Sequence, residues 1–600
     1  MEKYLDFSVQ KSRMEMDMVR IRKETIMRRA KLTALVLSLA MAMSTAGAFA
    51  CTGVYIGSEA SLDGTTIVGR SEDQGKGFYS KMFKVEPRKT EAGRYYVDEG
   101  VEQEGFKVPL PETTYKYTYV PDSSDLEDGQ YPGSCTNEYG VVVVGTVSAS
   151  PKAAFEEQDP YVHPGLREAI LPGLIACQVK TARGAVDKLA ELTDKYGSEE
   201  GNILFFVDKK EAWIFESYGG HQYAAMKMPK DKVSVFGNHF MIGQVNKNDH
   251  RNFVFSDGLF ETMEKAGGVV IENGKYNLVK SISDYPREDY NNMRNWGGMK
   301  LLAPSKAGAY SDNTYYPLFY KPDHKVSVGR VMDVFRYRYE GTEFDMMKPG
   351  NEGMRAIGVA RSSQVHIVQN FKFLPSDTCN LQWLAMGNAE HSVFIPAFSG
   401  ITDTHPAYQV DGSYKYNHDS LYSATKRMNV ASYDRQFLSQ GVKDYWKLQE
   451  KMMIRDTKKE LAKIGRAYAK GRDNGRTYVT ELSKEYAEEQ YKNSDALFDE
   501  LLFTSINNVN DRPDNGRKAV FVPNIDLVKC AKAAGYYVNS EDGETYTFTK
   551  YNKTAKYVVK AGEKNCTARI KGTTKNVELS RAPYVENGVL YAPTDFARTL

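Results

Sequence analysis

The sequence predicts a mixed α+β fold followed by a separate C-terminal module. Between residues 51 and about 400, short runs typical of strands surround a longer stretch with helical spacing. Beyond residue 440, two long stretches carry apolar residues at the intervals typical of amphipathic helices. A polar, turn-rich segment at 507–516 precedes the last part of the chain, so we expect a linker there.

The first 50 residues are expected to be a leader. Basic residues at 28–31 precede an apolar run at 32–43, and Ala48-Phe49-Ala50 is a small-x-small cleavage site. Residues 1–26 are charged and carry no apolar face, so we expect translation to start at Met27. Cleavage after Ala50 would leave Cys51 as the first residue of a bacterial protein that is secreted or held at the cell surface.

Two other interpretations of Cys51 compete with this one. Any residue can follow a signal peptide by coincidence, and a cysteine there can also be the lipidated residue of a lipoprotein. Lipidation is disfavoured because Ala48 and Phe49 stand where such a signal has an aliphatic and then a small residue.

The expected elements follow in chain order. One helical stretch is predicted at Gly165–Tyr196, and long amphipathic helices are predicted at Asp444–Lys470 and Thr480–Leu502. The strand-like runs are Thr52–Ile56, Thr65–Gly69, Val141–Thr146, Asn202–Val207, Ala212–Glu216 and Val233–Phe236.

The segment after the linker has its own pattern. A small helix is predicted at Ile525–Ala534, followed by β-type segments with hairpin turns at Glu541–Glu544 and Asn587-Gly588. The expected organisation is therefore a leader (1–50), a main domain (51–506), a linker (507–516) and an accessory domain (517–600).

Composition and motifs exclude several functions. Lys+Arg 79 against Asp+Glu 77 gives a net charge of +2, so nothing points to nucleic acid. After the leader, no apolar run approaches the length of a membrane span. The six cysteines are scattered, with no CxxC and no zinc spacing, and there is no HExxH, GxSxG, Walker or dinucleotide motif. We therefore expect no metal and no cofactor.

Cys51 is the strongest catalytic candidate. As a first residue it would carry a thiol and a free α-amine, and an amine with a pKa near 8 can act as the base for its own side chain. Two short strands joined by a turn would bring Arg70 and Asp73 back beside it. Arg70 would favour the thiolate by its charge, and Asp73 would hold the terminal ammonium. A plain surface Arg–Asp pair is the competing interpretation.

At this point the sequence resembles a known family. CTGVYIGSEASLDGTTIVGRSEDQG, which begins at Cys51, is similar to the opening of the cysteine dipeptidases related to dipeptidase A. These belong to the N-terminal nucleophile hydrolases, with penicillin V acylases and bile salt hydrolases. The resemblance continues through blocks at 134–150, 180–197, 211–225, 233–243, 293–305 and 360–375.

The resemblance implies a four-layer αββα fold and a set of site residues. Cys51 would be the nucleophile, with its amine as the base, and Arg70 and Asp73 would position and tune it. Asn238, in Phe236-Gly237-Asn238, would donate into the oxyanion hole, and Arg294 matches a second catalytic arginine more loosely. His239, His366, His391 and Glu216 are expected to be structural.

One departure from the family bears on specificity. Bile salt hydrolases have a further asparagine after the NExG block, but residues 143–148 contain none, so a second polar group would be Thr146, Ser148 or a backbone N–H. This favours hydrolysis of dipeptides and small peptides over an acylase that cleaves N-acyl amino acids. A surface binding protein that keeps the scaffold without turnover is the alternative from another class.

The tail resembles a different family. Residues 577–597, with VELS, AP and NGVLYAP followed by a helix start, are similar to the small domain at the N-terminus of some copper amine oxidases. No copper ligands stand nearby. We therefore expect an accessory or spacer module that can associate with the cell wall, and we expect the protein to be a homo-oligomer.

Overall fold

The computed structural model describes residues 51–600 except 75–79, 101–104, 124–128, 285–288, 352, 412–415, 434 and 508–520. The predicted leader and nearly all of the predicted linker lie outside the described residues.

The first of two central sheets begins with the strand that follows Cys51. Its six strands are all antiparallel to their neighbours, in the order β14-β1-β2-β19-β20-β21. They are nearly free of exposed residues, because helices cover one face and the second sheet covers the other. Their bounds are β1 (Thr52–Ile56), β2 (Thr66–Asp73), β14 (Val233–Phe236), β19 (Ser362–Asn370), β20 (Asn380–Met386) and β21 (Ile395–Phe398).

The second sheet has eight strands in the order β16-β13-β12-β11-β10-β9-β8-β3. It packs on the first through β10 against β1 and β2, and through aromatic rings such as Phe205 and Phe236, whose centroids are 5.8 Å apart. Its bounds are β3 (Lys84–Glu86), β8 (Tyr117–Tyr119), β9 (Ser134–Asn137), β10 (Val142–Ser148), β11 (Asn202–Val207), β12 (Ala212–Ser217), β13 (Tyr223–Lys227) and β16 (Phe253–Phe255).

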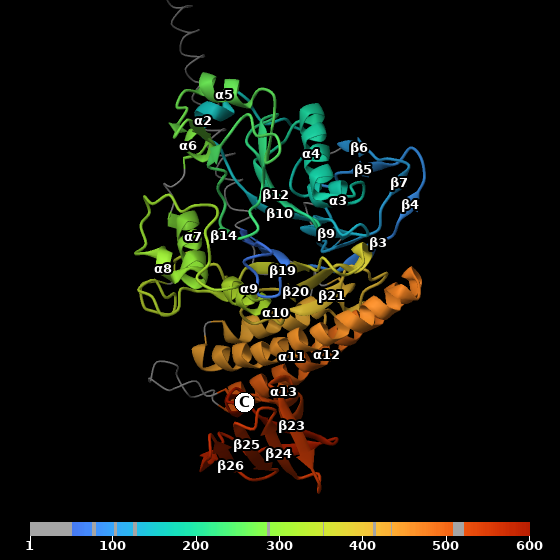
Figure 1. Ribbon diagram of the computed structural model, residues 1–600, viewed down its shortest axis with the longest axis vertical. Coiled ribbons are helices and arrows are strands. Elements are labelled where there is room, and N and C mark those ends of the chain that lie inside the picture. Colours follow the sequence, from blue (N-terminus) through green and yellow to red (C-terminus); the bar gives the residue numbers. More distant parts are fainter. Residues whose placement is uncertain are drawn as a thin grey trace, which may run out of the picture. The chain divides into compact units, whose positions relative to one another are not determined.

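Helices cover the outer faces of both sheets, which confirms the predicted αββα sandwich (Figure 1). On the eight-stranded sheet lie α3 (Leu171–Ala176) and α4 (Ala182–Tyr196). On the six-stranded sheet lie α7 (Asp289–Leu302), α9 (Val328–Arg336), α10 (Leu421–Ser432), α11 (Gln436–Ala469) and α12 (Arg472–Asn507).

Shorter elements complete the main domain. The helices are α2 (Ala153–Glu156), α5 (Leu259–Ala266), α6 (Leu278–Ile282), α8 (Pro304–Ala307), η2 (Ser376–Thr378) and η3 (Pro406–Tyr408). The strands are β4 (Lys89–Thr90), β5 (Tyr95–Val97), β6 (Lys107–Pro109), β7 (Thr113–Thr114), β15 (Gln244–Val245), β17 (Ile271–Glu272) and β18 (Lys275–Asn277).

The single helix predicted at Gly165–Tyr196 is wrong, because the structure has two helices there. Pro172 has no N–H for a bond to the preceding turn, so α3 starts only at Leu171. The side chain of Asn137 donates to the carbonyl oxygens of Ala176 and Val179, both at 2.8 Å, which satisfies the end of α3. Helix α4 then starts after Thr181, whose hydroxyl caps it.

The two long helices are longer than predicted. The sequence Asp473-Asn474-Gly475 resembles a turn, yet it lies inside α12. Gly475 is needed there because a Cβ would lie 2.3 Å from the ring of Tyr468 on α11. The chain reverses at Gly471, which has φ +141°, and the two helices run side by side against β21 (Figure 1).

The C-terminal residues form two small sheets and two helices. The predicted hairpin turns are confirmed, and Asn587 and Gly588 have the positive φ values of 49° and 76° that such a turn needs. The elements are β22 (Asn524–Asp526), α13 (Leu527–Ala533), β23 (Tyr536–Ser540), β24 (Thr545–Lys550), β25 (Ala555–Lys560), β26 (Asn565–Ile570), β27 (Thr573–Glu578), β28 (Tyr584–Glu586), β29 (Val589–Pro593) and α14 (Thr594–Ala597).

These C-terminal elements pack directly on α11. The N–H of Phe521 donates to the carbonyl of Phe437 at 3.0 Å, and a Cβ on Gly441 would lie 2.3 Å from the carbonyl oxygen of Phe521. The sulfur atoms of Cys530 and Met452 are 3.7 Å apart. The predicted boundary at 507–516 and the resemblance of the tail to a separate family both stay predictions.

Candidate active site

The β1–β2 hairpin brings Arg70 to Cys51. Gly53 pairs with Arg70 and Thr52 pairs with Ser71, so the end of β2 returns beside the start of β1. Nη2 of Arg70 lies 3.2 Å from Sγ of Cys51. Both side chains are fully buried. The register between β1 and β2 therefore brings Arg70 beside Cys51, as predicted.

The environment of the thiol favours its protonated form. Burial is the largest cause and raises the pKa of Cys51 to about 11. Arg70 acts in the expected direction and lowers the pKa, but Glu168 and Asp73 oppose it. A thiol with this pKa is almost wholly protonated near neutral pH, so its reaction as a nucleophile requires a base.

Arg70 is the centre of a buried ionic cluster. Its Nη2 lies 2.7 Å from Oε1 of Glu168, and its Nη1 lies 3.6 Å from Oε2 of Glu72. Nη2 also donates to the hydroxyl of Tyr131 at 3.3 Å. Burial opposes the charge of Arg70, but its anionic neighbours raise its pKa well above the usual range. Arg70 is therefore a fixed positive charge beside the thiol.

Asp73 lies at the end of β2 and is also fully buried. Its carboxylate forms an ion pair with Arg355 and accepts a hydrogen bond from Ser362 at 2.5 Å. The hydroxyl of Ser71 donates to it at 3.2 Å and accepts from the N–H of Thr52 at 3.2 Å. Asp73 is thus connected to the backbone next to Cys51 through Ser71.

Asn238 and Arg294 come together on the other side of Cys51. Arg294, on α7, donates to the main-chain carbonyl of Cys51, and its Nη2 donates to Oδ1 of Asn238 at 2.9 Å. Asn291, one turn earlier, accepts from the N–H of Asn238 at 2.8 Å and donates to its carbonyl at 3.0 Å. Gly237 is required here, because a Cβ would lie 2.5 Å from Nη2 of Arg294. All five predicted site residues therefore lie around one point of the fold.

The two hydroxyls proposed as a second polar group differ in placement. Thr146 donates to the carbonyl of Ile203 on the neighbouring strand at 2.6 Å, which occupies its proton. Ser148 donates to Oε2 of Glu168 at 3.2 Å and so faces the Arg70 cluster. A register shift between Gly145 and Val147 separates the two positions.

Sequence reasoning missed several charged groups at this site. Glu168 precedes α3, Arg355 lies in the loop before β19, and Lys81 lies 2.8 Å from Glu72. Asp73 and Arg355 are 282 residues apart, and no local spacing connects them. Strand β2 is fully buried although it carries charged side chains, and buried charges need partners of opposite sign. This was the one available signal that other parts of the chain must supply further charges.

The histidines that lie near the site are neutral. His366 pairs with Arg70 across β2 and β19, and burial, reinforced by the Arg70 charge, lowers its pKa to about 3. His239 is buried and its Nε2 is 3.2 Å from Oδ1 of Asn295, on α7. Burial lowers its pKa to about 3 as well. Neither is a base for the thiol at neutral pH.

Glu216 fixes the segment that follows Asn238. Its carboxyl oxygens accept from the N–H groups of Met241 at 2.7 Å and Ile242 at 3.2 Å, and from the hydroxyl of Tyr218 at 2.9 Å. Burial raises its pKa to about 7. Its contacts are those of a structural residue, as expected.

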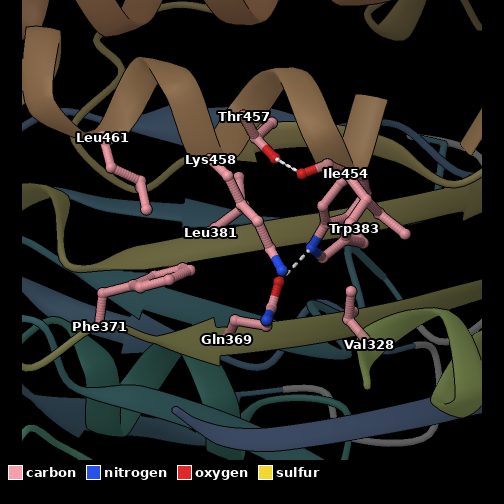
Figure 2. Close-up of a pocket in the computed structure, with 9 residues that line it drawn as sticks. All are labelled: Val328, Gln369, Phe371, Leu381, Trp383, Ile454, Thr457, Lys458 and Leu461. Atoms are coloured by element: carbon pink, nitrogen blue, oxygen red, sulfur yellow. Dashed lines mark hydrogen bonds between the residues drawn. The ribbon is translucent and has the colours of Figure 1, made fainter. Parts of the chain in front are cut away.

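A small apolar pocket lies on the face of the six-stranded sheet that is opposite to Arg70 (Figure 2). Gln369 is three residues from His366 along β19, so its side chain points away from the face that carries Arg70. Nε1 of Trp383 donates to Oε1 of Gln369 at 2.8 Å, and Figure 2 shows this hydrogen bond beneath α11. This pocket is separated from Cys51 by the sheet itself.

The described part of the chain carries neither a metal-binding cluster nor a membrane-spanning helix. Among the described residues, no group of three or more His, Cys, Asp or Glu side chains could hold a metal ion. Within the same residues, no helix combines the length and the apolar character needed to cross a membrane.

The sequence is similar to those of a known protein family. Residues 50–448 match peptidase family C69, and the chain belongs to that family. It is 32% identical over 483 residues to "Probable dipeptidase B" of Streptococcus pyogenes serotype M1, covering 77% of this chain and 95% of that protein. It is 30% identical over 366 residues to "Probable dipeptidase" of Latilactobacillus sakei, covering 60% and 76%.

A solved structure gives a weak match. A single-residue variant of conjugated bile acid hydrolase from Clostridium perfringens matches with a TM-score of 0.27 and 9% identity, covering 56% of this chain and 89% of that one.

Proposed function

We propose that this peptidase is a dipeptidase that uses the thiol of Cys51 as its nucleophile. The contact between Cys51 Sγ and the buried Arg70, at 3.2 Å, is the observation that carries the proposal. Membership of peptidase family C69 and the dipeptidase names of its relatives support the substrate class.

The reaction follows from the groups around Cys51. The α-amine of mature Cys51 takes the thiol proton, because the neighbouring histidines are neutral and have pKa values far too low. The thiolate attacks the peptide carbonyl carbon, and Arg70 stabilises its charge. Nδ2 of Asn238, oriented by the contact of its Oδ1 with Arg294, donates to the developing oxyanion. The amine then gives the proton to the leaving amine, and water hydrolyses the thioester.

Export and assembly are further parts of the proposal. The apolar run at 32–43 and the cleavage site at 48–50 support export and removal of residues 1–50, which would create the required amine. The family match begins at residue 50, next to Cys51. We also propose a homo-oligomer and an association of residues 517–600 with the cell wall.

The test is a panel of dipeptides and N-acyl amino acids given to purified mature protein, together with N-terminal sequencing. Hydrolysis of dipeptides by protein that begins at Cys51 is the expected result. Preferred cleavage of acyl amino acids would favour an acylase, and no turnover from a correctly processed thiol would favour a binding protein. Size-exclusion chromatography and sedimentation with cell walls test the other two parts.

A further inference from the structure

Glu168 places a second charge beside the nucleophile. Its side chain is 2% exposed, and its Oε1 lies 2.7 Å from Nη2 of Arg70. The same Nη2 atom lies 3.2 Å from Sγ of Cys51. Oε1 and Sγ are therefore no farther apart than the sum of these two distances.

Strand β10 holds this carboxylate and leaves room for it. Ser148 donates to Oε2 at 3.2 Å, and a Cβ on Gly145 would lie 3.1 Å from Oε1. The N–H of Glu168 itself donates to Oε1 of Glu200 at 2.8 Å, which fixes the backbone. Across the described part of the chain, Oε1 accepts no hydrogen bond of good geometry. A buried carboxylate oxygen with remaining acceptor capacity is suited to bind a cationic donor.

The free amine of a bound dipeptide lies at a distance from Sγ similar to that of this oxygen. Only one Cα separates the α-ammonium nitrogen from the carbonyl carbon that is attacked, so these two atoms are about 2.5 Å apart. In an attack geometry the carbonyl carbon lies about 3–3.5 Å from the nucleophile. The ammonium nitrogen is therefore within about 6 Å of Sγ in any productive pose. Glu168 lies in the same shell around Sγ.

We propose that Glu168, held by Ser148, binds the free α-ammonium group of the substrate and restricts the enzyme to peptides with an unblocked N-terminus. This deepens the proposed dipeptidase function and rests on it. Arg70 keeps Glu72 as a second anionic neighbour at 3.6 Å, so the guanidinium stays compensated when Glu168 also binds the substrate amine.

Two other roles for Glu168 make different predictions. A carboxylate that only neutralises Arg70 would affect every substrate equally. A carboxylate that holds the α-ammonium of mature Cys51 would also affect every substrate equally, and in addition it would shift the pH dependence of the reaction. Only a substrate-binding role separates free from blocked amines.

The experiment compares one dipeptide with its N-acetyl derivative. Mature wild-type protein and Glu168→Gln are assayed for kcat/KM on both, and the competitive Ki of the N-acetyl compound replaces kcat/KM if it is not cleaved. We expect Glu168→Gln to lower kcat/KM for the free dipeptide about 10- to 100-fold, the range for a lost charged hydrogen bond. The value for the N-acetyl derivative should change less than about 3-fold. The exposed Glu157→Gln is the matched control.

Other outcomes overturn the inference. Equal losses on both substrates assign Glu168 to Arg70, and equal losses with a shifted pH profile assign it to the Cys51 amine. If Glu168→Gln does not fold, Ser148→Ala keeps the carboxylate and should lower the ratio of free to blocked cleavage in the same direction. Wild-type protein that cleaves both substrates equally defeats this inference alone, whereas wild-type protein without any dipeptide hydrolysis defeats the proposed function.

Discussion

Arg294 donates to Oδ1 of Asn238 at 2.9 Å, and this contact orients the amide that is proposed to stabilise the oxyanion. With Oδ1 facing Arg294, the amide presents Nδ2 as its donor. Arg294 also donates to the carbonyl of Cys51, so one guanidinium fixes the nucleophile's backbone and the oxyanion donor together. A guanidinium is suited to this because its donors are held in a rigid plane.

Replacement of Asn238 by Ala should lower kcat with little change in KM. Loss of one oxyanion donor typically costs about 10²- to 10³-fold in kcat, because the donor acts mainly on charge that develops in the transition state. Steady-state kinetics on a dipeptide measures both constants. A change confined to KM would show that Asn238 binds the ground-state substrate instead. Gln244→Ala, at an exposed position after the same loop, is the control.

Retention of residues 1–50 should leave the protein folded but inactive. In the unprocessed chain the nitrogen of Cys51 is an amide, which cannot accept the thiol proton, and the buried thiol has a pKa of about 11. Processed and unprocessed protein are compared by thermal melting and by dipeptide hydrolysis. Full activity of uncleaved protein would contradict the mechanism. In processed protein, Cys51→Ala should abolish turnover and Cys51→Ser should leave at most a small residual rate.

Arg70→Gln should slow the alkylation of Cys51. Removal of the positive charge removes the main influence that lowers the thiol pKa, so the pKa should rise further and the thiolate fraction should fall. We expect at least about a 10-fold slower reaction with iodoacetamide at pH 8, since each pKa unit changes the thiolate fraction about tenfold. Mass spectrometry assigns the label to Cys51.

Two comparisons make the Arg70 experiment decisive. Arg183→Gln, a surface arginine paired with Asp187, should leave the rate unchanged. Arg70→Lys keeps the positive charge between the buried carboxylates and should leave the alkylation rate close to that of the wild type. An unchanged alkylation rate in folded Arg70→Gln would refute the electrostatic role.

Site residues could be predicted from local sequence only where they lie close together along the chain. Cys51, Arg70 and Asp73 could be placed together because one tight hairpin connects them, and β1 has the predicted bounds. Asn238 and Arg294 came from the family resemblance alone. Glu168 and Arg355 could not be found, because tertiary packing of separate layers brings them to β2 and no periodicity records that.

In the fold, too, features set by local sequence could be predicted, and features set by tertiary contacts could not. The six strand runs predicted in the main domain are confirmed because they are mostly apolar. Strands β19, β20 and β21 were not predicted, and the ends of helices depended on tertiary contacts. The break after α3 depends on a side chain from β9, Asn137. The extension of α12 depends on the ring of Tyr468 lying against Gly475. Neither contact can be deduced from local sequence.

Glu216 should make the protein less stable as pH rises. Its folded pKa of about 7 is above the unfolded value near 4.5, so the folded state holds the proton between these values and stability falls as pH rises through them. The loss is at most about 3.5 kcal/mol, since one pKa unit corresponds to about 1.4 kcal/mol. Thermal melts from pH 5 to pH 8 measure it.

Glu216→Gln isolates this contribution from other titrating groups. A neutral amide can still accept from the N–H groups of Met241 and Ile242, so the variant should lose less stability between pH 5 and pH 8 than the wild type does. Parallel pH curves for the two proteins would show that Glu216 does not titrate in this range.

The contact between α11 and the tail determines how a truncation should behave. Removal of residues 517–600 should leave dipeptide hydrolysis within a few-fold, because the described residues beyond 520 pack on α11 and α12 rather than around Cys51. Stability should fall, since Gly441 and Met452 on α11 lose their cover from Phe521 and Cys530. Association with cell walls should weaken if the tail supplies it. Loss of activity in a soluble truncated protein would place the tail within the catalytic domain.

Gly441→Ala tests the same interface without deletion. Within a helix, alanine is favoured over glycine by about 1 kcal/mol. If nothing packed on Gly441, the substitution Gly441→Ala would therefore make the protein more stable. In the packed structure the new Cβ would lie 2.3 Å from the carbonyl oxygen of Phe521, so we expect a lower melting temperature in the full chain. Gly465→Ala is the matched control, because a Cβ there meets no atom within 4 Å and should stabilise α11. In the truncated protein Gly441→Ala should become stabilising, and if it is stabilising in the full chain as well, the tail does not pack on α11.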